Sequence, residues 1–253
     1  MHVLGIETAT SIASVAIVNA DQVISELEQP MRGSHARTLL PLIDAALVAA
    51  QLELGGLDLI AVSIGPGTFT GLRIGLSVAK GLALATGLPV VGVPTLEAYA
   101  HRAGVRPGLL CPVLDARKGE VYGAAFQFGA HRAGTANAEP TALQCVIAPA
   151  AIAPNRFAAS LQQQPCTLFG DGVDAYAELW RRELGNEAEL IPFADLAPSA
   201  AVVARLGAAR AGSPDAADTA DLEPSYCRQS EAELSHARLQ TPAGVEKLTA
   251  GRW

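Results

Sequence analysis

The sequence predicts an α/β fold built from two related domains, and three observations support this prediction. Apolar strands alternate with helix-like segments over residues 57–103, a pattern that favours partly parallel sheets covered by helices. The order of strand, polar turn and strand in residues 3–18 returns in 109–128, which indicates an internal repeat. The chain has 253 residues, 50% of them apolar, enough for two cores. We therefore expect domains at 1–105 and 106–228, followed by an extended or partly disordered tail at 229–253.

The first domain is expected to begin with three strands and to continue with helices. Residues 3–7 and 13–18 are apolar runs around a turn rich in Thr and Ser, and residues 22–29 alternate like a third strand. Apolar spacing then predicts a helix over 34–51, with Ser34 as N-cap and a kink at Pro41. The remaining elements are a strand at 57–65, a helix at 72–86, a strand at 88–93 and a helix at 95–103.

The second domain has a weaker pattern. Two strands are expected within 109–128, whereas 129–165 carries little periodicity and predicts variable loops and one helix. Residues 166–184 predict a strand, a glycine turn and a helix, and 198–211 predict a further helix.

Charge and cysteine content limit the class of protein. The formal net charge is −7, which argues against this chain as the main holder of a nucleic acid, because such binding depends on Lys and Arg at phosphates. The cysteines, Cys111, Cys145, Cys166 and Cys227, are widely spaced. We expect them to be reduced, buried and structural, because apolar runs surround most of them. No signal peptide and no membrane span is evident, so a cytoplasmic, soluble protein is expected.

A glycine-rich turn, SIGPGTFTGLRIGLSVAKG over residues 63–81, stands where a strand meets a helix. It lacks the Lys of a P-loop, and its glycines are spaced one residue too far apart for the dinucleotide fingerprint. Backbone N–H groups at the start of the helix could still hold an anion, but a tight turn and close packing are favoured.

The helix after this turn has a ridge of small residues. Gly71, Gly75, Ala79 and Ala83 recur every four residues, and glycine inside a helix costs about 0.5 to 1 kcal/mol relative to Ala. The ridge therefore needs a compensating close contact, either within its own domain or with another subunit.

Catalytic and metal-binding candidates are few. Ser77 resembles a nucleophile elbow by its neighbours but falls in the middle of the expected helix. His35 would need a second His at position 39, which is Leu39, so no metal is expected. Polar residues at the two equivalent turns suggest a vestigial nucleotide cleft with no cofactor: Glu7, Thr8, Ser11, Asp115 and Arg117.

Five segments together resemble the bacterial TsaB family, also called YeaZ: GIETATSIASVAI, HARTLLPLID, SIGPGTFTGLRIGLSVAKGLALATGLPVVGVPTLEA, VLDARKGEVYGAAF and EPSYCR. The resemblance is dense over residues 3–128, thin over 129–220 and returns at 223–228. It implies a two-domain, ribonuclease H-like fold of the actin, sugar kinase and Hsp70 type, with mixed sheets flanked by helices.

The resemblance also implies a role in making threonylcarbamoyladenosine beside the anticodon of tRNAs that read codons beginning with A. In that pathway the paralogue TsaD performs the transfer, the ATPase TsaE is a third member, and this chain would be the non-catalytic partner that TsaD requires. The alternative is a glycoprotease-like peptidase acting on its paralogue. The paralogue binds metal through two histidines four residues apart, and this chain matches His35 at the first position and Leu39 at the second.

The helices at 34–51 and 72–86 are expected to dock onto the paralogue, or onto a second copy when the chain is alone, because both are apolar on more than one face. In this interpretation tRNA is bound only through the complex. The expected interface residues are His35, Leu39, Leu42, Ile43, Ala46, Gly71, Leu72, Gly75, Leu76 and Ala79.

Overall fold

The computed structural model describes residues 1–31, 35–129, 141–212, 221–225 and 227. The expected tail at 229–253 and the N-cap at Ser34 lie outside these residues. The elements run in the order β1 (His2–Glu7), β2 (Ile12–Asn19), β3 (Gln22–Pro30), α1 (His35–Ala49), a 3-10 turn (Leu54–Gly56), β4 (Leu59–Gly65), α2 (Phe69–Thr86), β5 (Val90–Pro94), α3 (Thr95–Ala103), β6 (Leu109–Arg117), β7 (Glu120–Gly129), β8 (Thr141–Ile152), α4 (Pro154–Ser160), β9 (Cys166–Phe169), α5 (Asp171–Ala175), α6 (Ala177–Leu184), a second 3-10 turn (Gly185–Glu187), β10 (Ala188–Ile191) and α7 (Ala200–Arg210).

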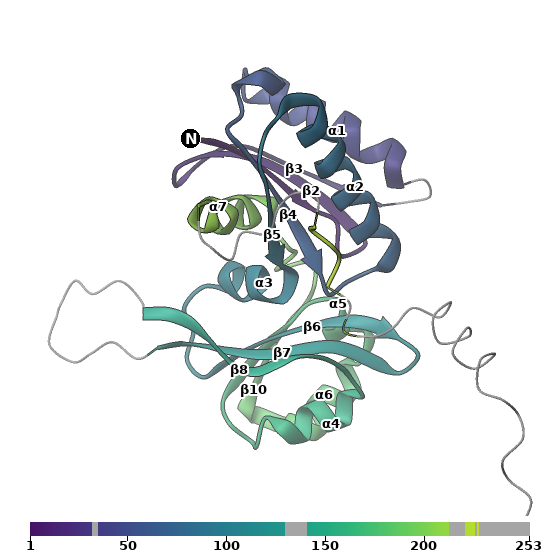
Figure 1. Ribbon diagram of the computed structural model, residues 1–253. Helices are drawn as coiled ribbons and strands as arrows, with labels where there is room; N and C mark the ends of the chain where they lie inside the picture. Colours follow the sequence, from purple (N-terminus) through teal and green to yellow (C-terminus); the bar gives the residue numbers. More distant parts are fainter. Residues whose placement is uncertain (32–34, 130–140, 213–220, 226, 228–253) are drawn as a thin grey trace, which may run out of the picture.

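Two five-stranded sheets share one strand order (Figure 1). The first runs β3-β2-β1-β4-β5 and the second runs β8-β7-β6-β9-β10, so each strand of the first has an equivalent in the second. In both sheets the first three strands of the repeat are antiparallel and the last two are parallel to the first. This duplication confirms the internal repeat and the α/β fold with two mixed sheets.

Several boundaries differ from the sequence predictions. The helix α2 begins at Phe69 instead of 72, and a break at Tyr176 divides the expected single helix into α5 and α6. The strands β8 and β10 were missed. Most described side chains of β8 are exposed and its pairing with β7 shifts register repeatedly, so no regular alternation marked it as a strand in 129–165.

Helices cover both faces of the first sheet. The helices α1 and α2 bury apolar side chains on one face, where Leu4, Ile6 and Ile60 are fully buried. The helix α7 covers the other face and contacts α3 beside it. Pro41 lies inside α1, as the sequence predicts.

The helix α3 lies between the two sheets (Figure 1). Its Ala98 belongs to the core on the first sheet, whereas its Tyr99 belongs to a core shared with the second sheet. The Tyr99 ring meets the Phe169 ring edge to face, with centroids 5.1 Å apart, and its hydroxyl donates to the carbonyl of Leu196. The other face of the second sheet is covered by α4 and α6, where Phe157 and Trp180 are buried.

The strands of the two sheets lie on either side of residue 105, whereas one helix from the second half of the chain packs on the first sheet. The helix α7 lies in the expected segment 106–228, yet it packs on β1, β2 and β4 of the first sheet. Two glycines allow this close packing, because a Cβ at Gly5 would overlap the Ala200 carbonyl and a Cβ at Gly207 would overlap the Ala61 side chain. Residues far apart in sequence therefore complete the first domain.

A polar network fixes the N-terminus of α7 on the strands. One carboxylate oxygen of Glu26 on β3 accepts hydrogen bonds from the Ser199 hydroxyl at 2.7 Å and the Ala201 N–H at 3.1 Å. The Ser14 hydroxyl accepts from the Ala200 N–H at 3.1 Å. Because the first N–H groups of a helix have no partners inside the helix, these contacts add to the local cap, in which the Ser199 hydroxyl accepts from the Val202 N–H at 3.4 Å.

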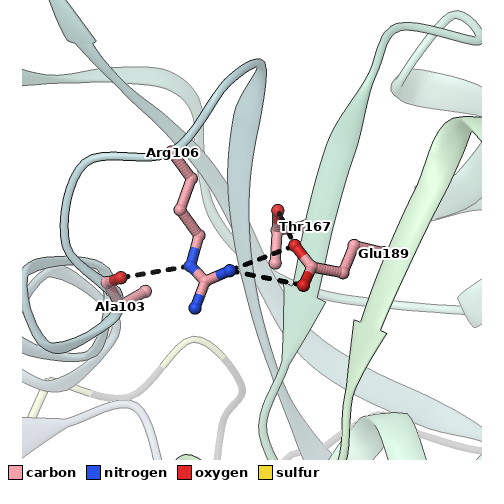
Figure 2. Close-up of polar contacts among 4 residues, drawn as sticks. All are labelled: Ala103, Arg106, Thr167 and Glu189. Carbon is pink, nitrogen blue, oxygen red and sulfur yellow. Dashed lines mark hydrogen bonds and ion pairs between the residues drawn. The ribbon is translucent and has the colours of Figure 1, made fainter.

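The segment that joins α3 to β6 is tied to the edge of the second sheet (Figure 2). The Arg106 guanidinium donates from Nε to the Ala103 carbonyl at 3.2 Å and pairs through Nη1 with Glu189 on β10 at 3.1 Å. The Thr167 hydroxyl on β9 also donates to Glu189, at 3.2 Å. Both charged side chains are partly exposed, so this pair contributes little to stability.

The cysteines are free and differ in burial. Cys111 and Cys166 are buried, Cys227 is intermediate and Cys145 is exposed on β8, so the expectation of burial is wrong for Cys145. None of the helices that the structure describes is long and apolar enough to cross a membrane.

Candidate functional site

The glycine-rich turn packs against the chain's own β1–β2 turn. The Thr68 N–H donates to the Ala9 carbonyl at 2.7 Å, and a Cβ at Gly67 would lie 2.6 Å from that oxygen. A Cβ at Gly71 would overlap the Thr8 carbonyl, and a Cβ at Gly75 would overlap the Thr8 hydroxyl. The glycines therefore allow close packing, as expected, and the backbone of the first turn fills the place in front of them.

The small-residue ridge of α2 packs within its own domain. The residues predicted for the interface are buried within the chain itself: Leu39, Leu42, Ile43, Ala46, Gly71, Leu72, Gly75, Leu76 and Ala79. Thr8 lies against Gly71 and Gly75 on this ridge, and an approach of another subunit along it stays a prediction. The side chain of His35 lies outside the described residues.

Large apolar side chains are exposed on the outer sides of the same two helices. Leu40 and Val48 on α1 are 51% and 70% exposed, and Leu84 on α2 is 90% exposed. Phe69 at the start of α2 is also exposed, and the Arg73 guanidinium lies over its ring at 3.9 Å. The sequence predicts that both helices are apolar on more than one face, and these exposed side chains lie outside the faces that pack on the sheet.

Glu7 is the buried ionisable group of the first turn. Its carboxylate is 1% exposed and accepts from the Ala9 N–H at 2.6 Å, and the Ser63 hydroxyl is a further partner. Burial raises the pKa of Glu7 from its usual value of 4.5 to about 7. The buried Thr8 hydroxyl has no hydrogen-bond partner among the described residues, and Ser11 is exposed. Glu7 thus shapes the turn in which it lies.

Asp115 in the second sheet likewise binds the backbone of its own turn. One of its oxygens accepts from the Arg117 N–H at 2.8 Å, and the other pairs with the Arg117 guanidinium at 3.0 Å. Its own N–H donates to Asp171 at 2.8 Å, and burial raises the pKa of Asp171. Arg117 has a φ of 61°, a strained value for a residue with a side chain. These contacts hold the second turn in its shape.

Two acidic residues from different parts of the chain, Glu7 and Asp171, influence Tyr99 of α3. The negative charges of Asp171 and Glu7 both raise the pKa of Tyr99, after the larger effect of its burial. Each of these carboxylates accepts a backbone hydrogen bond, Glu7 from the Ala9 N–H and Asp171 from the Asp115 N–H.

The remaining candidate positions from the sequence lie on α1 and α2. Ser77 lies exposed in the middle of α2, as expected, and not at a strand-to-helix turn. Leu39, at the position where a second histidine would be needed, is buried in the core. Among the residues that the structure describes, no three His, Cys, Asp or Glu side chains form a group that could hold a metal ion.

Comparisons with known proteins agree with this geometry. Residues 29–236 match the family model described as TsaD, tRNA N6-adenosine threonylcarbamoyltransferase. The chain is 40% identical over 129 residues to the tRNA threonylcarbamoyladenosine biosynthesis protein TsaB of Escherichia coli K12, covering 50% of this chain and 55% of that protein. It is 27% identical over 242 residues to TsaB of Bacillus subtilis 168, covering 95% and 100% of the two chains. The chain thus aligns with about half the length of the Escherichia coli protein.

Solved structures give the same result. The structure titled YeaZ from Pseudomonas aeruginosa superposes with a TM-score of 0.70 at 26% identity, over 89% of this chain and 99% of that chain. A second Pseudomonas aeruginosa structure, described as similar to peptidase YEAZ, has a TM-score of 0.72 at 26% identity, over 90% and 99%. The fold of the chain is therefore that of these YeaZ structures. The chain belongs to the family described as TsaD, tRNA N6-adenosine threonylcarbamoyltransferase, and within it to the TsaB (YeaZ) group.

Proposed function

We propose that this chain is a non-catalytic partner subunit in the synthesis of threonylcarbamoyladenosine in tRNA. It acts with a TsaD-type paralogue that performs the transfer and with the ATPase TsaE, and the product is the modified adenosine beside the anticodon. Two relatives named as biosynthesis proteins of this nucleoside support the pathway. The tRNA reaches the complex through the partner, since the net charge of this chain is −7.

The observation that carries this proposal is the exposed apolar face of α1 and α2. Leu40, Val48 and Leu84 lie on two adjacent helices, and such a surface favours association with another protein. The paralogue belongs to the same fold, so equivalent helices would meet these two in a bundle, and a second copy of this chain would mimic that contact.

The state of the two turns supports a non-catalytic role. Glu7 and Asp115 accept hydrogen bonds from the backbones of their own turns, and Thr8 packs against Gly75. The peptidase alternative would need Ser77 as nucleophile, and its position inside α2 does not favour it. Incubating the pure chain with the paralogue, with Ser77→Ala as control, tests it: cleavage that the control abolishes would support the peptidase.

Two matched substitutions test the docking face. Val48→Glu places a charge on the proposed interface, whereas Val146→Glu places the same charge at an equally apolar, exposed position on β8. We expect Val48→Glu to weaken binding to the paralogue by about tenfold or more, because burying an unpaired charge is costly. Val146→Glu should leave it unchanged.

Binding is measured by titration with the paralogue and by mass in solution, and function by modification of tRNA in a mixture with the paralogue and TsaE. Wild-type binding and modification by a Val48→Glu protein that folds normally would place the interface elsewhere. Modification by the pure chain alone would contradict the non-catalytic role.

A further inference from the structure

A short C-terminal segment returns to the first sheet and lies beside the start of α2 (Figure 1, yellow-green). It comprises residues 221–225, here called the strap. The Ser225 N–H donates to the carbonyl of Ile64, near the end of β4, at 2.7 Å. Leu222 is buried in the core beneath α1 and α2, and it lies over Gly92 of the edge strand β5, where a Cβ would come within 2.6 Å of it. The strap therefore fills the sheet face next to α2.

The strap completes the support of the turn between β4 and α2. A Cβ at Gly65 would lie 2.7 Å from the Ser225 carbonyl and 3.0 Å from the Leu72 side chain, so strap, turn and helix are in mutual contact. The Gly65 N–H donates to the Thr95 hydroxyl at 3.1 Å, and the Thr68 N–H donates to the Ala9 carbonyl. The turn is thus held by three segments distant in sequence, of which the strap is the only one outside the first 105 residues.

We propose that the strap is a positioning element for α2: Leu222 and the Ser225 N–H hold the β4–α2 turn in the form that presents the outer face of α2 to a partner. The strap acts through Gly65 and Leu72 at the base of the helix. Its effect on partner binding rests on the function proposed above, whereas its effect on the turn does not.

Hydrogen exchange of the isolated full-length chain tests the positioning directly. Ser225→Pro removes the N–H donor, and Ser225→Ala keeps it, so the pair isolates one hydrogen bond. We expect the amides of Gly65, Thr68 and Leu72 to exchange about two- to tenfold faster in Ser225→Pro and at the wild-type rate in Ser225→Ala. Unchanged exchange at these amides in Ser225→Pro would overturn the proposal.

A second pair of variants tests the same role in case the proline variant does not fold. Leu222→Ala removes the buried side chain that packs over Gly92, whereas Glu223→Ala changes an exposed residue of the same strap. Leu222→Ala should speed exchange in the β4–α2 turn more than in β6 and β9 of the second sheet. An equal increase in both sheets would show a general loss of stability and would overturn a positioning role.

Titration with the paralogue then gives the functional consequence. Ser225→Pro should bind about two- to tenfold more weakly than Ser225→Ala. Equal binding by the two variants, with faster exchange in the first, would overturn the link between turn and partner. If the wild-type chain itself does not bind the paralogue, the proposed function fails, and the exchange rates still decide whether the strap holds the turn.

Discussion

Gly75 of α2 lies so close to Thr8 of the β1–β2 turn that a Cβ at position 75 would overlap the Thr8 hydroxyl. That hydroxyl is buried and has no hydrogen-bond partner within the described part of the chain. The helix is therefore fixed on its own sheet through a glycine that a helix would otherwise disfavour. This contact explains the ridge of small residues without a second subunit.

Gly75→Ala should destabilise the chain. Alanine favours a helix by about 1 kcal/mol, but overpacking against Thr8 costs about 1 to 3 kcal/mol, so the net effect is a loss of stability. Urea unfolding measures it. Gly81→Ala in the same helix meets nothing within 4 Å and should instead stabilise by about 0.5 to 1 kcal/mol.

Thr8→Ala should restore much of the stability lost in Gly75→Ala, because it removes the hydroxyl that a Cβ at 75 would meet. A double-mutant cycle in urea checks this coupling; additive effects would mean that Thr8 is not the obstacle. By the same argument Gly75→Leu, which adds a larger side chain at this contact, should disrupt folding.

Stability should fall as pH rises through the pKa of Glu7. In the unfolded chain this carboxyl ionises near pH 4.5, and in the folded chain near 7, so the folded state binds more protons between these values. Its contribution is fully favourable below pH 4.5 and is lost as pH rises through about 7, a change on the order of 3 kcal/mol.

Glu7→Gln keeps an oxygen acceptor for the Ala9 N–H but cannot ionise. We expect it to be as stable as wild type near pH 5 and more stable near pH 8, as measured by urea unfolding at both. Glu53→Gln, at an exposed position, controls for the loss of one charge. A constant difference between Glu7→Gln and wild type across this range would show that Glu7 does not titrate there.

Glu26→Ala should release the N-terminus of α7 from the first sheet. The substitution leaves the Ser199 hydroxyl and the Ala201 N–H without their acceptor, at a cost of about 1 to 3 kcal/mol. Glu28→Ala, on the same strand and exposed, should have little effect. Hydrogen exchange of residues 200–204 distinguishes them, since equal protection in both variants would rule out a capping role for Glu26.

The isolated chain should bind tRNA only weakly at physiological salt, because its net charge of −7 opposes binding to phosphates. Fluorescence titration with and without the paralogue measures this. Tight binding by the pure chain that falls after Arg117→Ala would reveal a local basic site at the β6–β7 turn, where the Arg117 side chain is exposed.

The sequence by itself determined the repeat and the strands and helices of the first 105 residues. It also favoured close packing over anion binding at the glycine-rich turn. These features are local, because alternating strands, apolar runs and glycine spacing depend on near neighbours. β8 was missed because an exposed edge strand with register shifts has no alternation to detect.

Only the tertiary structure decided which side of α1 and α2 faces the core, since a helix apolar all round has no period that marks one face. In α2 the side that carries Gly75 packs on Thr8, so Leu84 is exposed. In the same way α7 packs on the first sheet through the hydrogen bond to Glu26 and the close approach at Gly5. The strap binds the same sheet through the Ile64 carbonyl. These pairings join residues more than 60 positions apart, and their specificity lies in hydrogen bonds and space that appear only when the chain is folded.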